Sequence, residues 1–532
     1  MAGFRKPEIP RDQMVLWSQR LDDAIPADHP VRHLAYLLES EAFAPRFREW
    51  VAEYVLLEGK PPYHPRDLAG LYIYGMLNKI RSSRQLEAAT YNRVDVTWLM
   101  SGQHPDHSTI AGFVNQHGTH LRKMFRDTVE VGIRAGLVKL EHAAVDGTKL
   151  EADAGKGSVH REATIATQLA TVDQKIEALE QEWSENESRE TRLFGSEVPW
   201  VPKVGGSAQE QLARLKSQQK RLKAALASIE RRRAENVVGP DPKPIASVTD
   251  PDSRVMPDKE GKRKPNYNAQ IAVDTEAGML TAQDVNDRTE DSGQLTPILE
   301  QVQGNCGSLP AEASADSQYN TGPELAVLEK TGVKGFLPDN GERSETDKVE
   351  TAATAALAAA QSGETLKDEQ WSALPKDSKG RITKAAFRYD QEANVYRCPM
   401  GQVLPFLQKR KDKKRWGTAE RMQYGGCPAC ADCPRAKMCC GDPRKGRIVS
   451  HDQYEGQRER MRERMNTEEG RSRYRLRGPT VESRFGYIKR GLGIRRFLHR
   501  GLSGVRTEWS LICMAVNVGI LLNHWAEVQK TL

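Results

Sequence analysis

The sequence lacks any apolar run long enough to cross a membrane, and it has no apolar segment near its start. Its most apolar stretch, Leu511–Leu522, is interrupted by Asn517 and is shorter than the roughly 20 residues that a membrane-spanning helix needs. The opening residues, MAGFRKPEIPRDQ, have no apolar core of the kind found in secretory signals. We therefore expect a soluble protein that stays inside the cell. A hydrophobic content of 38% over 532 residues excludes wholesale disorder and predicts about three or four structural units.

Cysteine is scarce and unevenly placed. Cys306 and Cys513 stand alone, whereas the other six fall within 43 residues. In a chain without a secretory signal, such clustering favours metal ligation over disulfide bonds. The clustered residues are Cys398, Cys427, Cys430, Cys433, Cys439 and Cys440.

A four-thiolate zinc site can be drawn within this cluster. Cys430, Cys433 and Cys439, with the upstream Cys398, form a set suited to structural Zn²⁺. Cys427 and Cys440 leave the choice of ligands open, because the Cys427–Cys430 pair has equally suitable spacing. A reduced, metal-free cluster is the alternative.

Positive charge is concentrated in one window. The net charge of +7 says little by itself, but Arg471–Arg506 contains eleven Lys or Arg residues and a single acid, Glu482. A cationic patch on an otherwise near-neutral chain is typical of a protein that binds a polyanion such as DNA. A solvated basic helix face is the alternative.

The pattern of elements changes along the chain. Residues 1–135 show helical periodicity, which suits a helix-turn-helix-like DNA reader or any small helical bundle. From Glu141 onward, segments such as HAAVDGTKLEADA and YNAQIAVD resemble strands, and the strand–helix–strand rhythm around 311–336 predicts a mixed sheet with helices packed on it.

A helical hairpin is expected within this α/β region. Apolar residues from Ile165 to Trp183 follow a 4-3-4-3-4 spacing, and a similar stripe runs from Leu212 to Ile229. A polar linker with Pro199 and Pro202 separates the two stripes. We interpret 160–235 as an antiparallel hairpin that serves as a spacer or a dimerisation arm.

Three acidic residues stand out by their context. Asp146 ends an apolar strand and precedes Gly147, and Asp316 follows a short strand. Glu482 is the only acid in the basic window, three residues after Pro479, which predicts a place in the first turn of a helix. Taken singly, Glu482 suits a salt bridge equally well. Lys489 lies seven residues further, on the same face of an α-helix.

Several widely spread segments resemble the bacterial insertion-sequence transposases that carry a DDE catalytic triad on an RNase H-like core. The Tyr474, Arg477, Glu482 and Lys489 pattern is similar to the family's signature around its third acid, with four residues between Arg477 and Glu482 where three are common. The other matching segments are PPYHPRDLAGLYIYGMLNKIRSSRQLEAA, WLMSGQHPDHSTIAGF, VDGTKLEADA, TDPDSRVM followed by YNAQIAVD, ASADSQYNTGPELAVLEKTG, YRCPMGQVL with the cysteines, and VESRFGYIKRGLGIRRFLHRGLSGVRTEWSLICMAVN.

The resemblance implies a function and a set of site residues. Asp146, Asp316 and Glu482 would be the triad and would hold two Mg²⁺ ions, with Mn²⁺ as a possible substitute. Water would free a 3′-OH at the element's end, and that 3′-OH would attack target DNA. Lys489 would contact a phosphate and Arg477 would position the strand. The DNA-binding set is Arg477, Lys489, Arg490, Arg495, Arg496 and Arg500.

The expected fold class is α/β and multi-domain. We expect a helical DNA-binding domain, an RNase H-like mixed-sheet core with two insertions, and basic C-terminal helices that complete the core. The boundaries are 1–135 for the helical domain, 136–345 for the first part of the core with its hairpin at 160–235, 346–385 for an Ala-rich helical linker, 386–450 for a zinc-ribbon-like insertion, and 451–532 for the C-terminal helices.

Two other hypotheses remain open. A domesticated nuclease on the same core would cut DNA without joining it, and a zinc-ribbon DNA-binding protein would use its carboxylates only structurally. The expected partners are double-stranded DNA, as transposon ends and target, and a second copy of the chain, without a membrane. The expected place of action is the bacterial cytoplasm, at the nucleoid.

Overall fold

The computed structural model describes residues 20–54, 61–194, 205–235, 244–257, 261–339, 347–377, 379–414 and 417–532. The chain forms two compact units. The first unit comprises Met1–Val138, Gly486–His499 and Ser503–Leu532, and the second comprises Lys139–Phe485 and Arg500–Leu502. The predicted C-terminal segment 451–532 is therefore divided between the units, because its last long helix packs with the N-terminal helices.

The first unit is helical, as the periodicity of 1–135 predicts. Proline in the first turn begins three of its helices, where a missing N–H costs nothing, and Asp106 caps another by accepting from two backbone N–H groups. The elements are η1 (Leu21–Ala24), α1 (Pro30–Glu39), α2 (Ala44–Ala52), α3 (Pro65–Leu77), α4 (Ser83–Asn92), α5 (Val94–Leu99), α6 (His107–Gln116), α7 (Gly118–Arg134), η7 (Tyr487–Gly491), α18 (Gly501–Asn523) and α19 (Trp525–Gln529).

Helix α18 is longer than its sequence suggests. The apolar stretch Leu511–Leu522 predicts a segment too short to span a membrane, but the helix has 23 residues and is the one helix in the described part of the chain that is long and apolar enough to do so. Of its most apolar window, 83% is buried inside the protein. Asn517, which interrupts the apolar run, is itself buried and donates to Thr128 Oγ1 at 3.1 Å. These contacts are those of a core helix.

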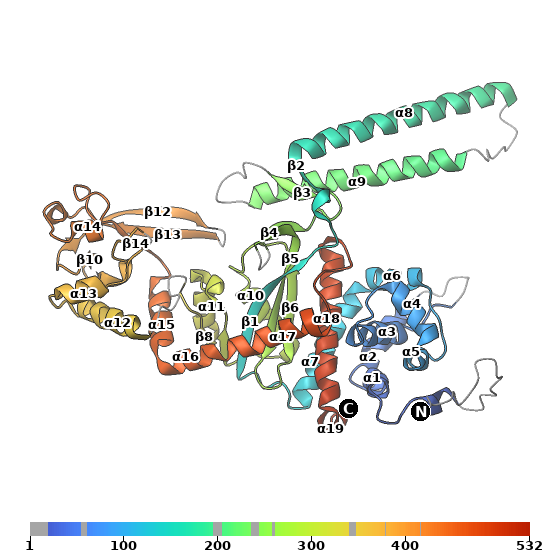
Figure 1. The fold of residues 1–532 in the computed structure, drawn as a ribbon, viewed down its shortest axis with the longest axis horizontal. Coiled ribbons are helices and arrows are strands. Elements are labelled where there is room, and N and C mark those ends of the chain that lie inside the picture. Colours follow the sequence, from blue (N-terminus) through green and yellow to red (C-terminus); the bar gives the residue numbers. More distant parts are fainter. Residues whose placement is uncertain are drawn as a thin grey trace, which may run out of the picture. The chain divides into compact units, whose positions relative to one another are not determined.

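The second unit is built on a mixed sheet. β1 (His142–Glu151) lies at its centre, antiparallel to β5 (Arg263–Asp274) and parallel to β7 (Glu312–Ser314), which is parallel to β8 (Lys334–Phe336). β4 (Arg254–Pro257) and β6 (Leu280–Asn286) both pair antiparallel with β5. The sequence predicts this combination of strands and helices, and the structure confirms it (Figure 1).

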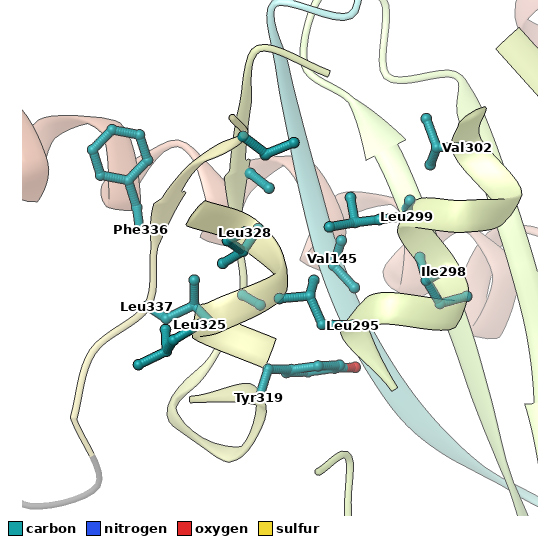
Figure 2. Packing of buried hydrophobic residues seen from close by; sticks show 14 of the residues in the cluster. Val145, Leu295, Ile298, Leu299, Val302, Tyr319, Leu325, Leu328, Phe336 and Leu337 are labelled. Carbon is teal, nitrogen blue, oxygen red and sulfur yellow. The ribbon is translucent and has the colours of Figure 1, made fainter. Parts of the chain in front are cut away.

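Helices cover the sheet and form its core. α10 (Leu295–Cys306), α11 (Gly322–Thr331) and α15 (Glu455–Asn466) contribute buried side chains to one cluster with β1. Figure 2 shows Val145 of β1 beside Leu295 and Leu299 of α10. This packing fixes the position of β1 and β7 against the helices, and Asp146 follows directly after Val145.

The hairpin insertion is present where the heptad spacing predicts it. α8 (Glu162–Phe194) and α9 (Gly205–Glu235) pack through a seam that includes Ile165, Val172 and Leu222. Its base joins the unit through η2 (Lys156–Ser158) and the short pair β2 (Val159–Arg161) and β3 (Ile245–Ser247). Trp183, predicted within the seam, is 38% exposed. The predicted linker with Pro199 and Pro202 lies outside the described residues.

The Ala-rich segment is part of the cysteine-rich region and does not form a separate linker. Ala356 and Trp371, from the predicted linker 346–385, share a buried cluster with Tyr396 and Tyr424 from the predicted insertion 386–450. Small alanine side chains let a helix approach the strands closely. The elements are α12 (Asp347–Ser362), α13 (Asp368–Ala373), η4 (Lys384–Ala386), β9 (Arg388–Asp390), β10 (Val395–Arg397), β11 (Val403–Leu404), β12 (Phe406–Lys414), β13 (Gly417–Tyr424), η5 (Pro428–Cys430), α14 (Ala436–Cys439) and β14 (Val449–Asp452).

The helix that carries Glu482 begins earlier than its proline suggests. α16 (Glu468–Arg475) continues into η6 (Gly478–Glu482), a π-helix, then α17 (Ser483–Gly486) and the π-helical η7. Glu482 therefore lies in the middle of a helical segment and not in a first turn. Pro479 has no N–H to donate, and in an α-helix its ring would clash with the carbonyl group four residues earlier. The helical segment therefore widens into a π-helix at this point and does not begin there.

Candidate active site

Asp146 and Asp316 meet because their strands are parallel neighbours. β1 and β7 pair in a register that places Ala144 opposite Ser314. Asp146 lies two residues after Ala144, and Asp316 lies two residues after Ser314. Both aspartates are therefore at the same level of the sheet. Two of the three predicted catalytic acids are thus brought together by strand register alone.

Arg477 joins this pair from the helical segment. Its Nη2 lies 2.9 Å from Asp146 Oδ1, and both side chains are largely buried. Burial raises the pKa of Asp146 to about 6, and the negative charges of Asp316 and Asp291 add to this rise. The Arg477 charge and the Gly147 backbone N–H oppose it. Burial outweighs the ion pair, so the carboxyl holds its proton more tightly than an ordinary aspartic acid does.

Asp316 begins a turn and is held by it. Its Oδ1 accepts from the Gln318 backbone N–H at 2.8 Å, at the start of η3 (Ser317–Tyr319). Burial raises the pKa of Asp316, while the Gln318 N–H and Arg477 lower it. Arg477 therefore acts on both aspartates and offsets part of their mutual repulsion.

A third buried aspartate lies close by, and sequence reasoning missed it. Asp291 Oδ1 accepts from Asn268 Nδ2 and from Gln270 Nε2, both at 2.6 Å, and Lys149 Nζ lies 3.6 Å away. Its charge raises the pKa of both Asp146 and Asp316. Asp291 sits in a polar loop with no signal of its own. The only hint in the sequence is on β5, where the polar Asn268 and Gln270 alternate with apolar residues in a strand that is buried from Pro265 onward.

Lys149 and Tyr319 complete the buried polar cluster. Burial lowers the pKa of Lys149, while Asp291, Asp146 and Asp316 raise it. Tyr319 is completely buried and donates its hydroxyl to Gln270 Oε1. Burial raises the pKa of Tyr319 well above its usual value, and the three aspartates add to the rise. The cluster contains three carboxyl groups and two cations, so it has an excess of potential negative charge.

Gly147 is required by close packing. A Cβ at this position would lie 2.3 Å from Gln270 Nε2 and 2.6 Å from Asp291 Oδ1. No real Cβ contact is this short, so any other residue at 147 would displace the hydrogen bonds that hold Asp291. The glycine after Asp146 thus has a structural cause that the sequence alone does not reveal.

Glu482 lies on the same helical segment as Arg477 but is exposed. Its turn, η6, packs against β1 and β5. The charges that act most strongly on Asp146 are those of Arg477, Asp316 and Asp291, and Glu482 is not among them. The structure therefore groups two members of the predicted triad and leaves the third on the adjoining helix.

The π-helix accounts for the unusual spacing between Arg477 and Glu482. An α-helix repeats through i to i+4 hydrogen bonds, whereas a π-helix repeats through i to i+5. Two residues five apart across η6 are therefore one helical turn apart, as two residues four apart are in an α-helix. The additional residue between Arg477 and Glu482 is thus absorbed within the bulge, and the flanking helix keeps its phase.

The predicted DNA-binding residues differ in their surroundings. Arg490, Arg495 and Arg496 are exposed and Lys489 is half-buried, all four within the first unit. Arg477 pairs with Asp146, and Arg500 pairs with Asp153 at 2.9 Å. Arg477 and Arg500 thus each have a carboxylate partner.

Five of the six clustered cysteines line one cavity, one more than the predicted four. This cavity of about 30 Å³ is lined by five thiols, by Arg435 and Arg447, and by apolar side chains such as Trp371 and Leu404. Cys427 does not line it, so the geometry favours the Cys430 and Cys433 pair over the Cys427 and Cys430 pair. Burial raises the pKa of Cys439 to about 12, so without a cation the thiol keeps its proton. The lining cysteines are Cys398, Cys430, Cys433, Cys439 and Cys440.

Within the described residues, no group of three or more His, Cys, Asp or Glu side chains is arranged so that it could hold a metal ion. This applies to the carboxylates around Asp146 and to the thiols around Cys433. The oxygen donors at the first site have the chemistry that Mg²⁺ prefers, and the sulfur donors at the second have the chemistry that Zn²⁺ prefers.

Two family models match the chain. The model described as a transposase DDE domain matches residues 397–522, which include Arg477 and Glu482. The model described as a transposase domain (DUF772) matches residues 19–116, which include helices α1 to α6. Asp146 and Asp316 lie between the two matched segments. No curated protein and no solved structure matches the chain. The two matches support the identification of this chain as an insertion-sequence transposase of the DDE family.

Proposed function

We propose that this chain cleaves DNA strands at the ends of an insertion sequence and joins the freed ends to target DNA. The observation that carries the proposal is the meeting of Asp146 and Asp316 at one level of the sheet, with Arg477 beside them. Paired acidic groups with displaced pKa values are typical of sites that handle phosphoryl transfer.

The sheet supports an RNase H-like core. β6, β5 and β1 are successive antiparallel neighbours, and β7 and β8 extend the sheet parallel to β1. The hairpin insertion lies between β1 and β5, and the cysteine-rich region lies between β8 and α15. The core elements thus keep their order while both insertions leave from loops, where added length costs little.

Asp146, Asp316 and Glu482 are the residues that would hold divalent metal. Two Mg²⁺ ions, when bound, would supply activation of the attacking oxygen and stabilisation of the leaving one. Arg477 offsets the repulsion between the two aspartates, and Gly147 leaves room for the hydrogen bonds of Asp291. Burial is the main cause of the raised pKa of Asp146, and repulsion from Asp316 and Asp291 adds to it. Because the cluster has more carboxyl groups than cations, binding of a dication would relieve that repulsion.

The test is a strand-cleavage and strand-transfer assay on DNA that carries the element's ends, with Mg²⁺. Asp146→Asn and Glu482→Gln each keep the size of the side chain and remove its charge. We expect both variants to bind DNA and to lose cleavage and joining by at least 100-fold, since each removes a proposed metal ligand. The matched controls are Asp432→Asn and Glu177→Gln, at exposed positions in the same unit.

The outcomes separate the competing hypotheses. Cleavage without joining in the wild type would indicate a nuclease. Binding without cleavage in every protein, with loss of function on zinc removal, would indicate a zinc-dependent DNA-binding protein. Full activity of Glu482→Gln would remove Glu482 from the proposed site and leave Asp146 and Asp316 in place.

A structural zinc site is part of the proposal. Four of the five cysteines around the cavity would hold Zn²⁺ and fix the loops of the cysteine-rich region, namely Cys398, Cys430, Cys433 and Cys439. Metal content measured by mass spectrometry should fall from about one zinc per chain to near zero in Cys433→Ser. Cys427→Ser is the control, because Cys427 is buried outside the cavity.

The proposed partners follow from the reaction. The chain would act on double-stranded DNA in the bacterial cytoplasm, at the nucleoid, as a homodimer that brings two ends together. The exposed Arg490, Arg495 and Arg496 would track the phosphate backbone and give steep salt dependence with little sequence discrimination.

A further inference from the structure

A two-stranded ribbon extends from the cysteine-rich region. β12 and β13 pair antiparallel over eight positions, from Phe406 with Tyr424 to Lys414 with Gly417. β14 pairs only with Arg421–Tyr424 of β13, at the base of the ribbon. The outer part, Lys411–Lys414 with Gly417–Glu420, therefore has two strands only. Figure 1 shows β12 and β13 side by side and reaching past β14.

The base of the ribbon is firmly held. Tyr424 is buried at the end of β13, and its ring packs against Tyr396 and His451 with centroid distances of 5.1 Å. Its hydroxyl donates to Asn394 Oδ1 at 2.8 Å. The outer part of the ribbon is thus presented by a packed aromatic base and not by a mobile loop.

The ribbon is strongly basic. Residues 406–424 contain seven Lys or Arg and two acids. Each acid has its own cation, because Lys409 pairs with Glu420 at 2.6 Å and Arg421 pairs with Asp412 at 2.8 Å. Excess positive charge therefore remains on the ribbon after these pairs are formed.

The excess charge lies on both faces of the ribbon, in its outer part and directly beside it. Arg410, Lys411 and Lys413 are exposed. Because side chains alternate along a strand, Lys411 and Lys413 share one face and Arg410 occupies the other. A partner that contacted only one face of the ribbon would neutralise only part of this charge. A groove with phosphates on both walls could contact the cations on both faces.

We propose that the β12–β13 ribbon binds the phosphate backbone of duplex DNA, with its outer part lying in a groove. The major groove, about 12 Å wide, admits a two-stranded ribbon, and phosphates line both of its walls. The contacts are to backbone phosphates, which position DNA without selecting its sequence. The inference deepens the proposed function, on which it rests for the choice of DNA as the polyanion.

The decisive measurement is the salt dependence of DNA binding by the full-length chain. The variant Arg410→Gln/Lys411→Gln/Lys413→Gln removes the three exposed cations and keeps polar side chains. Fluorescence anisotropy with a labelled duplex, from about 50 to 200 mM salt, gives the slope of log affinity against log salt. Each lost phosphate contact should reduce that slope by about 0.9, and affinity at the lowest salt should fall at least tenfold.

A matched control removes the same charge from the same region. Lys376, Lys379 and Lys445 are exposed outside the ribbon. The variant Lys376→Gln/Lys379→Gln/Lys445→Gln should leave the slope unchanged. A charge-preserving variant, Lys411→Arg/Lys413→Arg, should also retain the wild-type slope, which guards against loss of binding through misfolding.

Three outcomes would overturn the proposal. An unchanged slope in the ribbon variant would show that the ribbon does not contact phosphates. Equal losses in the ribbon and control variants would assign the effect to net charge. Aggregation with an unchanged slope would show that the lysines only protect a strand edge, a common use of lysine in sheets.

Failure of the proposed function would be distinguishable. Wild-type cleavage that persists in Asp146→Asn would refute the proposed catalytic site, while a reduced slope in the ribbon variant would still establish the ribbon as a DNA-binding element. An unchanged slope combined with loss of cleavage in Asp146→Asn would refute the ribbon alone.

Discussion

Gly147 links the first predicted catalytic residue to its buried surroundings. Gly147→Ala would place a Cβ within 2.6 Å of both Gln270 and Asp291 side-chain atoms. Because these side chains are buried and hydrogen-bonded, we expect the substitution to lower the free energy of unfolding by about 1–3 kcal/mol and to reduce cleavage. Thermal unfolding and the cleavage assay check this. Gly157→Ala is the control, since nothing lies within 4 Å of its Cβ, and equal behaviour of the two variants would contradict the packing argument.

Glu324 should make the second unit sensitive to pH. It is buried, and its carboxyl accepts from the Leu295 N–H at 2.6 Å and from Thr321 Oγ1 at 3.0 Å. Burial raises its pKa from 4.5 to about 7, despite these hydrogen bonds. The folded state therefore binds the proton more tightly than the unfolded chain, and stability should fall as pH rises from about 4.5 to about 7 and then level off.

The measurement compares the unfolding midpoint of the wild type and Glu324→Gln across this pH range. The variant cannot titrate at this position. Its free energy of unfolding should therefore fall less over this pH range than that of the wild type, by an amount on the order of 3 kcal/mol. Parallel curves for the two proteins would show that Glu324 is charged in the folded state at neutral pH.

Among the elements, η6 makes the sharpest prediction. Deletion of Pro479 removes both the residue that cannot donate and the additional residue between Arg477 and Glu482. The segment can then close into an α-helix with these two residues four apart, in the same relation as before. We expect the deletion to retain cleavage within about tenfold. Insertion of one alanine after Thr480 should abolish it, and the opposite ranking would refute the phase argument.

Sequence patterns predict elements well where one face of the element is repeatedly apolar. The α8–α9 hairpin, the β1 strand and the N-terminal helices all have such a face, and they lie where periodicity places them. The π-helix could not be predicted in this way, because Pro479 is equally typical of a helix start. Asp291 could not be predicted either, because it lies in a loop and its partners Lys149, Asn268 and Gln270 come from β1 and β5.

Across the whole molecule, the division into units departs most from the sequence. The basic window, Arg471–Arg506, predicts one functional segment, but it is shared between the two units. Periodicity contains no information about which distant element an apolar helix will join. The partners of α18 became visible only through contacts such as that between Asn517 and Thr128, which are 389 residues apart.

This division predicts how truncated chains behave. A chain that begins at Lys139 retains α18 but loses the helices that bury it, so we expect it to expose a large apolar surface and to aggregate. A chain that comprises 139–485 lacks α18 and should stay dispersed. Sedimentation and binding of an apolar fluorescent dye distinguish the two. A dispersed, dye-negative 139–532 chain would show that α18 does not depend on the N-terminal helices.

The late position of helix α18 in the chain also sets the order in which the two units can fold during synthesis. The ribosome releases the N-terminal helices first, yet the long helix that fills their core comes almost 400 residues later. The first unit therefore waits until α18 has been translated, while the strands and hairpin of the second unit emerge in between. A chain whose synthesis stops before α18 has an unfilled first unit, so only a chain translated through α18 can present both matched transposase segments in a folded state.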